Sequence, residues 1–141
     1  MTERELIDLA CEAMGRAYAP YSRFQVGAAL RCADGRVYTG CNIENAAYGP
    51  SVCAERVAFF TAVRDGERDF AKIAVVGGPE GKIRSYTYPC GVCRQVMREF
   101  CRDGFAVLTF DGKAIRTSTL IDLLPDSFSP ADLAHSAEDV L

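Results

Sequence analysis

The sequence predicts an α/β fold in which one mixed β-sheet is covered by helices. A helical pattern opens the chain, two β-rich runs then flank an Asp-Gly pair, and two later apolar runs alternate with helical patterns. The order helix, hairpin, helix, strand, helix, strand is typical of a single sheet packed between helices. A chain of 141 residues suffices for one hydrophobic core, so we expect one domain over residues 1–141.

The first helix and the hairpin after it have clear boundary signals. Thr2 and Glu5 form a capping-box pattern, and apolar residues then recur at helical spacing until Pro20, where we expect the helix to end. Residues 24–44 contain two β-rich runs on either side of the Asp-Gly pair, which favours a tight turn. This segment predicts an antiparallel hairpin.

Helices and strands alternate along the rest of the chain. The patterns predict helices over 54–64 and 91–102, strands over 72–78 and 105–110, and a short helix over 119–125. The 72–78 run is apolar almost throughout after its first residue, as is typical of a strand covered on both faces. That strand is therefore expected at the centre of the sheet.

Charge and composition disfavour several classes of partner. The 16 basic and 19 acidic residues give a net charge of −3, whereas proteins that bind nucleic acid usually carry a basic surplus. No apolar stretch approaches the ~20 residues that cross a bilayer, and the charged N-terminus lacks a signal-peptide pattern. We expect a cytoplasmic protein with no nucleic-acid or membrane partner.

Three of the seven cysteines form a candidate metal site. The odd number of cysteines argues against a disulfide framework. Cys90 and Cys93 form a C-x-x-C pair, and Cys53 begins a predicted helix, which a thiol-exchange pair would not require. Structural zinc sites close with four ligands, whereas three ligands leave a position for water, as in catalytic zinc sites.

The helix starts near these cysteines favour thiolates, and the charged residues Arg56 and Glu55 each have two interpretations. The predicted helix N-termini at Cys53 and at the C-x-x-C pair would lower the thiol pKa values. Arg56 could hydrogen-bond a thiolate or face solvent. Glu55 could be an ordinary first-turn acid, or it could take a proton from water beside a metal and pass it to a substrate nitrogen.

Four segments resemble the zinc nucleoside deaminases, and specifically the small homotetrameric cytidine deaminases. They are "YSRFQVGAAL" (21–30), "GCNIENAAYG" (40–49), "CAER" (53–56) and "PCGVCRQ" (89–95), and the resemblance extends from about residue 17 to residue 128. It implies a three-layer α/β/α fold with a mixed five-stranded sheet. It also implies one Zn²⁺ per subunit on Cys53, Cys90 and Cys93, with Glu55 as the proton shuttle.

The implied reaction is hydrolysis of cytidine and 2′-deoxycytidine to the uracil nucleoside and ammonia, for pyrimidine salvage. Asn42 and Glu44 alternate at a predicted strand end, so both side chains should share a face; in similar enzymes they bind the ribose 3′-OH. Base rates place Phe24 in the core, whereas the resemblance places its ring against the pyrimidine. Ala54 would offer backbone groups to the base.

The resemblance also implies a homotetramer with shared sites. Tyr48 and Phe128 match positions that reach a neighbouring subunit's site in the family, so an isolated monomer should be inactive. Apart from the resemblance, the position of Arg56 in the same turn as Cys53 suggests that it offsets part of the negative charge of the thiolates.

The sequence is also compatible with other functions. A related three-cysteine zinc deaminase could act on a cytosine-nucleoside antibiotic, although the "NIEN" segment resembles a ribose-binding element. A deaminase of polynucleotides would need a basic groove, which the composition does not favour. A non-catalytic zinc-stabilised binding module would need a fourth ligand, for which Cys41 is the nearby candidate, although its place on the hairpin favours core packing.

Overall fold

The computed structural model describes residues 1–133 and contains one mixed five-stranded sheet. The strand order is β2-β1-β3-β4-β5, in which β3 and β4 are parallel and the other pairs are antiparallel. Strand β3 is central, as predicted for the 72–78 run. The strands are β1 (Phe24–Cys32), β2 (Val37–Cys41), β3 (Phe70–Pro79), β4 (Ala106–Phe110) and β5 (Ile115–Thr119).

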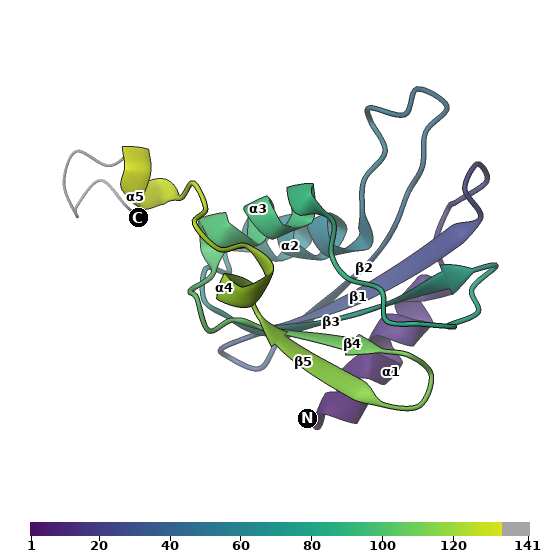
Figure 1. The fold of residues 1–141 in the computed structure, drawn as a ribbon, viewed down its shortest axis with the longest axis horizontal. Coiled ribbons are helices and arrows are strands. Elements are labelled where there is room, and N and C mark those ends of the chain that lie inside the picture. Colours follow the sequence, from purple (N-terminus) through teal and green to yellow (C-terminus); the bar gives the residue numbers. More distant parts are fainter. Residues whose placement is uncertain (134–141) are drawn as a thin grey trace.

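Helices cover both faces of this sheet, which confirms the expected three-layer α/β/α arrangement (Figure 1). One face packs against α1 alone, and the other packs against α2, α3 and α4. A last short helix, α5, follows them. The helices are α1 (Glu3–Met14), α2 (Ala54–Arg64), α3 (Gly91–Phe100), α4 (Leu120–Leu123) and α5 (Pro130–Leu133). Within residues 1–133, none of them is long and apolar enough to span a membrane.

The central strand separates two hydrophobic cores. Alternate side chains of β3 point to opposite faces, so Ala74 and Val76 join the core under α1, while Ile73 and Val75 join the core under α2 and α3. All four side chains are fully buried. Burial on both faces explains why residues 73–78 of this strand are continuously apolar instead of alternating with polar residues.

Two glycines in the hairpin let helices approach the sheet closely. A Cβ atom at Gly27 would lie 2.0 Å from the carbonyl oxygen of Ala10 in α1, and one at Gly40 would lie 2.3 Å from the carbonyl oxygen of Ala54 in α2. Both distances are far below van der Waals contact, so any side chain at these positions would push a helix away. Gly40 thereby sets the position of the first turn of α2.

Three features differ from the sequence predictions. The first helix has the predicted capping box but ends at Met14, because Gly15 caps it and Tyr18 pairs with Ile43. The sequence patterns do not predict strand β5, because its residues are polar or partly exposed at the sheet edge. Val92 is part of the apolar pattern that predicts the helix over 91–102, yet it is 58% exposed.

Candidate metal centre and active site

Three cysteine thiols meet where α2 and α3 begin. The Sγ atom of Cys53 lies 3.6 Å from that of Cys90, which lies 3.4 Å from that of Cys93, and all three atoms lie within 4.8 Å of one another. Tetrahedral zinc with Zn–S bonds of about 2.3 Å holds its sulfur ligands about 3.8 Å apart. The spacing of the thiols therefore fits a zinc ion bound by three cysteines.

Both helices direct their N-terminal ends at this cluster, as the sequence predicts. Cys53 is the N-cap residue of α2 and Cys90 is that of α3. The Sγ atom of Cys90 also accepts a hydrogen bond of 3.4 Å from the backbone N–H of Cys93. Free N–H groups and aligned peptide dipoles favour negative charge at a helix N-terminus, so the backbone stabilises thiolates here.

Arg56 faces the thiol cluster and not the solvent. Its Nη2 donates a hydrogen bond of 3.3 Å to Cys53 Sγ. A hydrogen bond from the Cys93 thiol and this one from Arg56 lower the pKa of Cys53 to about 5. The pKa of Cys93 is raised, because its thiol donates to Cys53 and is buried. The guanidinium group thus offsets part of the negative charge that three thiolates bring together.

Glu55 is buried beside the same cluster, only 3% exposed. A helix-start acid of the ordinary kind would be solvated, but the Oε1 atom of Glu55 is buried without a hydrogen-bond partner in the part of the chain that the structure describes. Burial raises the pKa of Glu55 to about 7, and the neighbouring Cys53 thiolate adds to this rise. An unpaired buried carboxyl oxygen is costly in a folded protein unless a ligand or water pairs with it.

A second group of metal-ligand side chains does not suit a cation. Cys32, Asp34 and Glu67 bring their ligand atoms within 4.8 Å of one another. Arg36, however, lies 3.9 Å from Asp34 and 3.8 Å from Glu67 and already supplies the positive charge. Burial also raises the pKa of Cys32 to about 12, so its thiol stays protonated.

Cys41 does not join the thiol cluster. Its thiol contacts the carbonyl oxygen of Arg16 at 3.5 Å, and its Sγ atom is not part of the group formed by the three candidate ligands. The closed four-cysteine site that a zinc-stabilised binding module would need is therefore not formed by this residue.

The segment expected to bind the sugar is joined to the thiol segment by backbone pairing. Ile43 and Val52 form an isolated antiparallel bridge just before Cys53. Strand β2 itself ends at Cys41, so Asn42 and Glu44 lie just beyond it. Both side chains turn toward the start of β1: Asn42 bonds to the backbone of β1, and Glu44 accepts hydrogen bonds from residues 21 and 22.

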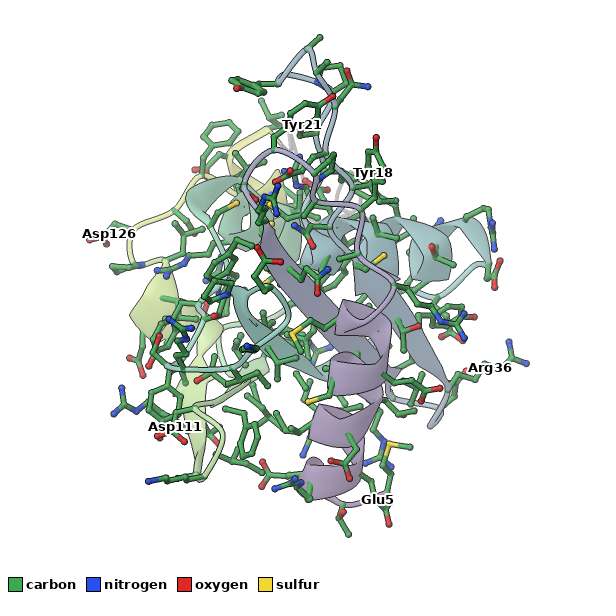
Figure 2. All side chains as sticks on the ribbon, turned by 90° about the vertical axis from the view of Figure 1, so that its right-hand side faces the viewer. Glu5, Tyr18, Tyr21, Arg36, Asp111 and Asp126 are labelled. Carbon is green, nitrogen blue, oxygen red and sulfur yellow. The ribbon has the colours of Figure 1, made fainter. Side chains whose placement is uncertain are left out.

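Aromatic side chains are exposed at this end of the molecule. Phe24 is 39% exposed, so its expected place in the core is wrong. Tyr48 is also exposed, Phe128 is exposed in the segment between α4 and α5, and Ala54 is buried. Figure 2 shows Tyr18 and Tyr21 at the end of the molecule opposite Glu5. A groove of about 330 Å³ opens there, lined by Tyr21, Ser22, Glu44, Tyr48 and Ser51.

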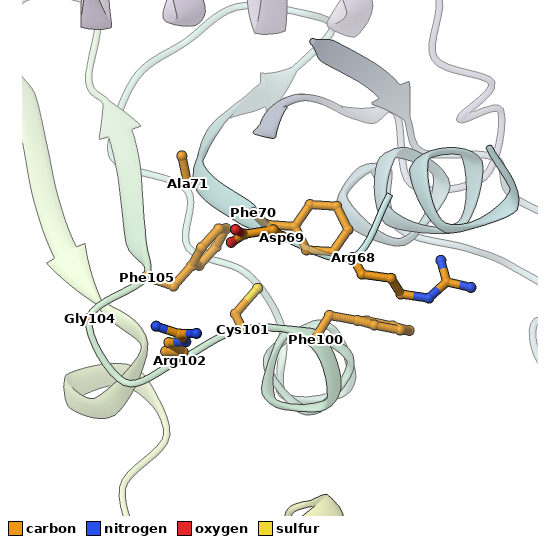
Figure 3. A pocket seen from close by; sticks show the side chains of 9 residues that line it. All are labelled: Arg68, Asp69, Phe70, Ala71, Phe100, Cys101, Arg102, Gly104 and Phe105. Carbon is orange, nitrogen blue, oxygen red and sulfur yellow. The ribbon is translucent and has the colours of Figure 1, made fainter. Parts of the chain in front are cut away.

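A larger hollow lies elsewhere on the described surface. It has a volume of about 630 Å³ and is formed where α3 ends and where β3 and β4 begin, with Arg68, Cys101 and Arg102 among its lining residues (Figure 3). The ten residues of α3 separate it from Cys90 by about 15 Å along the helix axis. It contains none of the residues expected to bind metal or substrate.

Three thiols at two helix N-termini beside a buried carboxyl group define a zinc-dependent hydrolytic enzyme of the α/β/α type. Residues 1–109 match the family model described as the cytidine and deoxycytidylate deaminase zinc-binding region. The chain belongs to this deaminase family.

Individual relatives agree with this assignment. A cytidine deaminase of Sporosarcina psychrophila is 48% identical over 139 residues, which cover 98% of this chain and 99% of that protein. The crystal structure of a cytidine deaminase from Burkholderia pseudomallei has a TM-score of 0.84 and 47% identity, covering 91% of this chain and 100% of that one. A blasticidin-S deaminase of Bacillus cereus is 32% identical over 126 residues, covering 86% of this chain and 88% of the relative.

Proposed function

We propose that this protein hydrolyses cytidine and 2′-deoxycytidine to the corresponding uracil nucleosides and ammonia, as a step of pyrimidine salvage. The observation that carries the proposal is the unpaired, buried carboxyl oxygen of Glu55 next to three thiols that fit zinc. Membership of the deaminase family and the names of the most similar relatives supply the substrate class.

Glu55 moves the protons of this reaction. When bound, zinc would act as a Lewis acid and lower the pKa of a water molecule. Glu55 accepts a proton from that water and delivers it to N3 of the cytosine ring, while the water oxygen bonds to C4. Glu55 then takes the proton of the new C4 hydroxyl group and delivers it to the amino nitrogen. The bond between C4 and this nitrogen breaks, ammonia leaves and a carbonyl group remains at C4, following the general chemistry of zinc deaminases.

The substrate is held by residues around the exposed end of β1. Asn42 and Glu44 bind a sugar hydroxyl, for which an amide and a carboxylate are suitable partners. Phe24 flanks the pyrimidine ring, which its 39% exposure permits. Ala54 is buried at the start of α2, so it contributes through its backbone groups. Arg56 holds Cys53 as a thiolate.

The working enzyme is a homotetramer with shared sites. Tyr48 is 76% exposed and Phe128 is 57% exposed, and a second copy of the chain would cover both rings. The Phe128 carbonyl accepts a hydrogen bond of 2.9 Å from Gln95 on α3, which ties this segment to the helix that carries two of the thiols. All seven cysteines are free, in keeping with a cytoplasmic location.

A second candidate is deamination of a cytosine-nucleoside antibiotic, favoured by the similarity to a blasticidin-S deaminase. That relative is 32% identical, against 48% for the cytidine deaminase of Sporosarcina psychrophila, so cytidine is the better-supported substrate.

Turnover of cytidine and of blasticidin S by the purified protein separates these functions. Absorbance of the cytosine ring and release of ammonia would be followed for both compounds. We expect kcat/KM for cytidine to be higher by at least about a hundredfold, a ratio available to a site that hydrogen-bonds the sugar. Faster turnover of blasticidin S would establish the second function, and turnover of neither would refute both.

A further inference from the structure

We propose that Ser22 is a positioning residue that fixes the sugar-binding carboxylate of Glu44 and the base-flanking ring of Phe24 relative to each other. This inference rests on the proposed function, which gives Glu44 and Phe24 these roles. The Ser22 hydroxyl donates a hydrogen bond to Glu44 Oε2 and accepts one of 3.0 Å from the backbone N–H of Phe24. One hydroxyl group therefore links the side chain of Glu44 to the backbone of Phe24.

Ser22 holds both oxygens of the Glu44 carboxylate. Glu44 Oε1 accepts hydrogen bonds from the backbone N–H groups of Tyr21, at 3.0 Å, and Ser22, at 3.1 Å. Among residues 1–133, Glu44 Oε2 accepts a hydrogen bond from the Ser22 hydroxyl alone. Hydrogen bonds from Ser22 hold the pKa of Glu44 below its ordinary value. Since each carboxylate oxygen can accept about two hydrogen bonds, Oε2 keeps capacity for a ligand hydroxyl.

The backbone of Phe24 is hydrogen-bonded at both its N–H group and its carbonyl oxygen. Its N–H bonds to Ser22, which bonds to Glu44, and its carbonyl oxygen accepts a hydrogen bond of 2.8 Å from Asn42 Nδ2. Asn42 Oδ1 in turn accepts from the N–H of Val26 at 2.8 Å. The backbone that carries the Phe24 ring and the side chains proposed to bind the sugar thus form one hydrogen-bonded unit.

The backbone at Arg23 makes this link possible. Arg23 has φ of 59°, in the left-handed region, so the chain turns sharply between Ser22 and Phe24. This turn brings the Phe24 N–H back to the hydroxyl two residues earlier, a pattern that serine side chains favour. Alanine at position 22 would lose both contacts of the hydroxyl, whereas threonine would keep the hydroxyl and add only a methyl group at an exposed position.

Steady-state kinetics of two variants test this role against a purely structural one. Ser22→Ala should raise KM for cytidine by about tenfold to a hundredfold, the range expected for a lost hydrogen bond to a charged group, with kcat within about threefold. Ser22→Thr should restore KM. Ser85→Ala is the matched control, because Ser85 is exposed and remote in sequence from the unit. Zinc content should stay unchanged in all three variants.

A substrate without the 2′- and 3′-hydroxyl groups shows whether Ser22 acts through Glu44. With 2′,3′-dideoxycytidine the increase in KM caused by Ser22→Ala should be smaller than with cytidine, because the 3′-hydroxyl group proposed to bind Glu44 is absent. An unchanged KM in Ser22→Ala, a loss confined to kcat, failure of Ser22→Thr to restore KM, or equal penalties for both substrates would each overturn the role of Ser22. Absence of cytidine turnover in the wild-type protein would instead refute the proposed function and this inference with it.

Discussion

Ile43 and Val52 exchange two backbone hydrogen bonds of 3.0 Å each. Each of these residues adjoins a part of the site: Ile43 lies between Asn42 and Glu44, and Val52 precedes Cys53. The loop between them projects from the sheet at the end where α2 begins (Figure 1). Two backbone bonds therefore hold the segment proposed to bind the sugar against the segment that carries Cys53.

Replacing Arg56 by Gln should weaken zinc retention. The guanidinium bonds to Cys53 Sγ at 3.3 Å, and its loss removes a charge-assisted hydrogen bond worth about 1.5–3 kcal/mol. Zinc should transfer to a chelator at least about tenfold more readily, as measured with a coloured zinc indicator. Arg64→Gln, on the exposed last turn of α2, is the control. Equal zinc retention in both variants would show that Arg56 has no part in the metal site.

Replacing Gly40 by Ala should destabilise the fold around α2. The new Cβ would lie 2.3 Å from the Ala54 carbonyl oxygen, a backbone atom that cannot move without shifting the helix. Overpacking of this kind costs about 1–3 kcal/mol, to be measured by urea unfolding. Gly104→Ala should have little effect, since no heavy atom lies within 4 Å of a Cβ there. Equal stability of the two variants would contradict the close approach of α2 to β2.

Cys90→Ser and Cys41→Ser should differ in zinc content. Cys90 Sγ lies 3.4 Å from Cys93 Sγ and 3.6 Å from Cys53 Sγ, so its loss removes a ligand, whereas the Cys41 thiol donates to the backbone carbonyl of Arg16. Elemental analysis should find zinc largely lost from Cys90→Ser and retained in Cys41→Ser, which should also stay active. Loss of zinc from Cys41→Ser would favour a closed, non-catalytic zinc site.

Mixed oligomers test whether the site is shared between subunits. Glu55→Gln and Tyr48→Ala chains should each have little activity alone. Random assembly of equal amounts should restore about a quarter of the sites, because a Tyr48→Ala subunit can take its tyrosine from a Glu55→Gln neighbour. Co-expression followed by a cytidine assay would measure this. Activity no higher than the sum of the two parents would mean that Tyr48 does not complete a neighbouring site.

The thiol cluster was predictable because its residues sit at helix starts, which sequence patterns mark well. Cys53 and Cys90 each precede a helical apolar pattern, and the sequence interval between them carries no geometric information by itself. Their meeting depends on α2 and α3 lying side by side on one face of the sheet. The burial of Glu55 follows from that packing, so first-turn propensity alone could not reveal it.

Other features depend on contacts that no local pattern encodes. The polar β5 is a strand because it pairs with the apolar β4. The first helix ends at Met14 although Ala17 and Tyr18 continue its apolar stripe, since Tyr18 pairs with Ile43 instead. Ser22 lies in the 21–30 segment that resembles the family, but the sequence assigns its side chain no role; its hydroxyl hydrogen bonds to Glu44, 22 residues away, and to the nearby Phe24 N–H indicate one.

Turnover and zinc content of Glu55→Gln, measured on the same preparation, test the central claim most directly. We expect zinc to be retained, because the three thiols are unchanged, while kcat for cytidine falls by at least about 10² to 10⁴-fold, the usual contribution of a general acid–base group. Glu99→Gln, exposed on α3, should keep full activity. A zinc-loaded Glu55→Gln protein that deaminates cytidine at the wild-type rate would contradict the account.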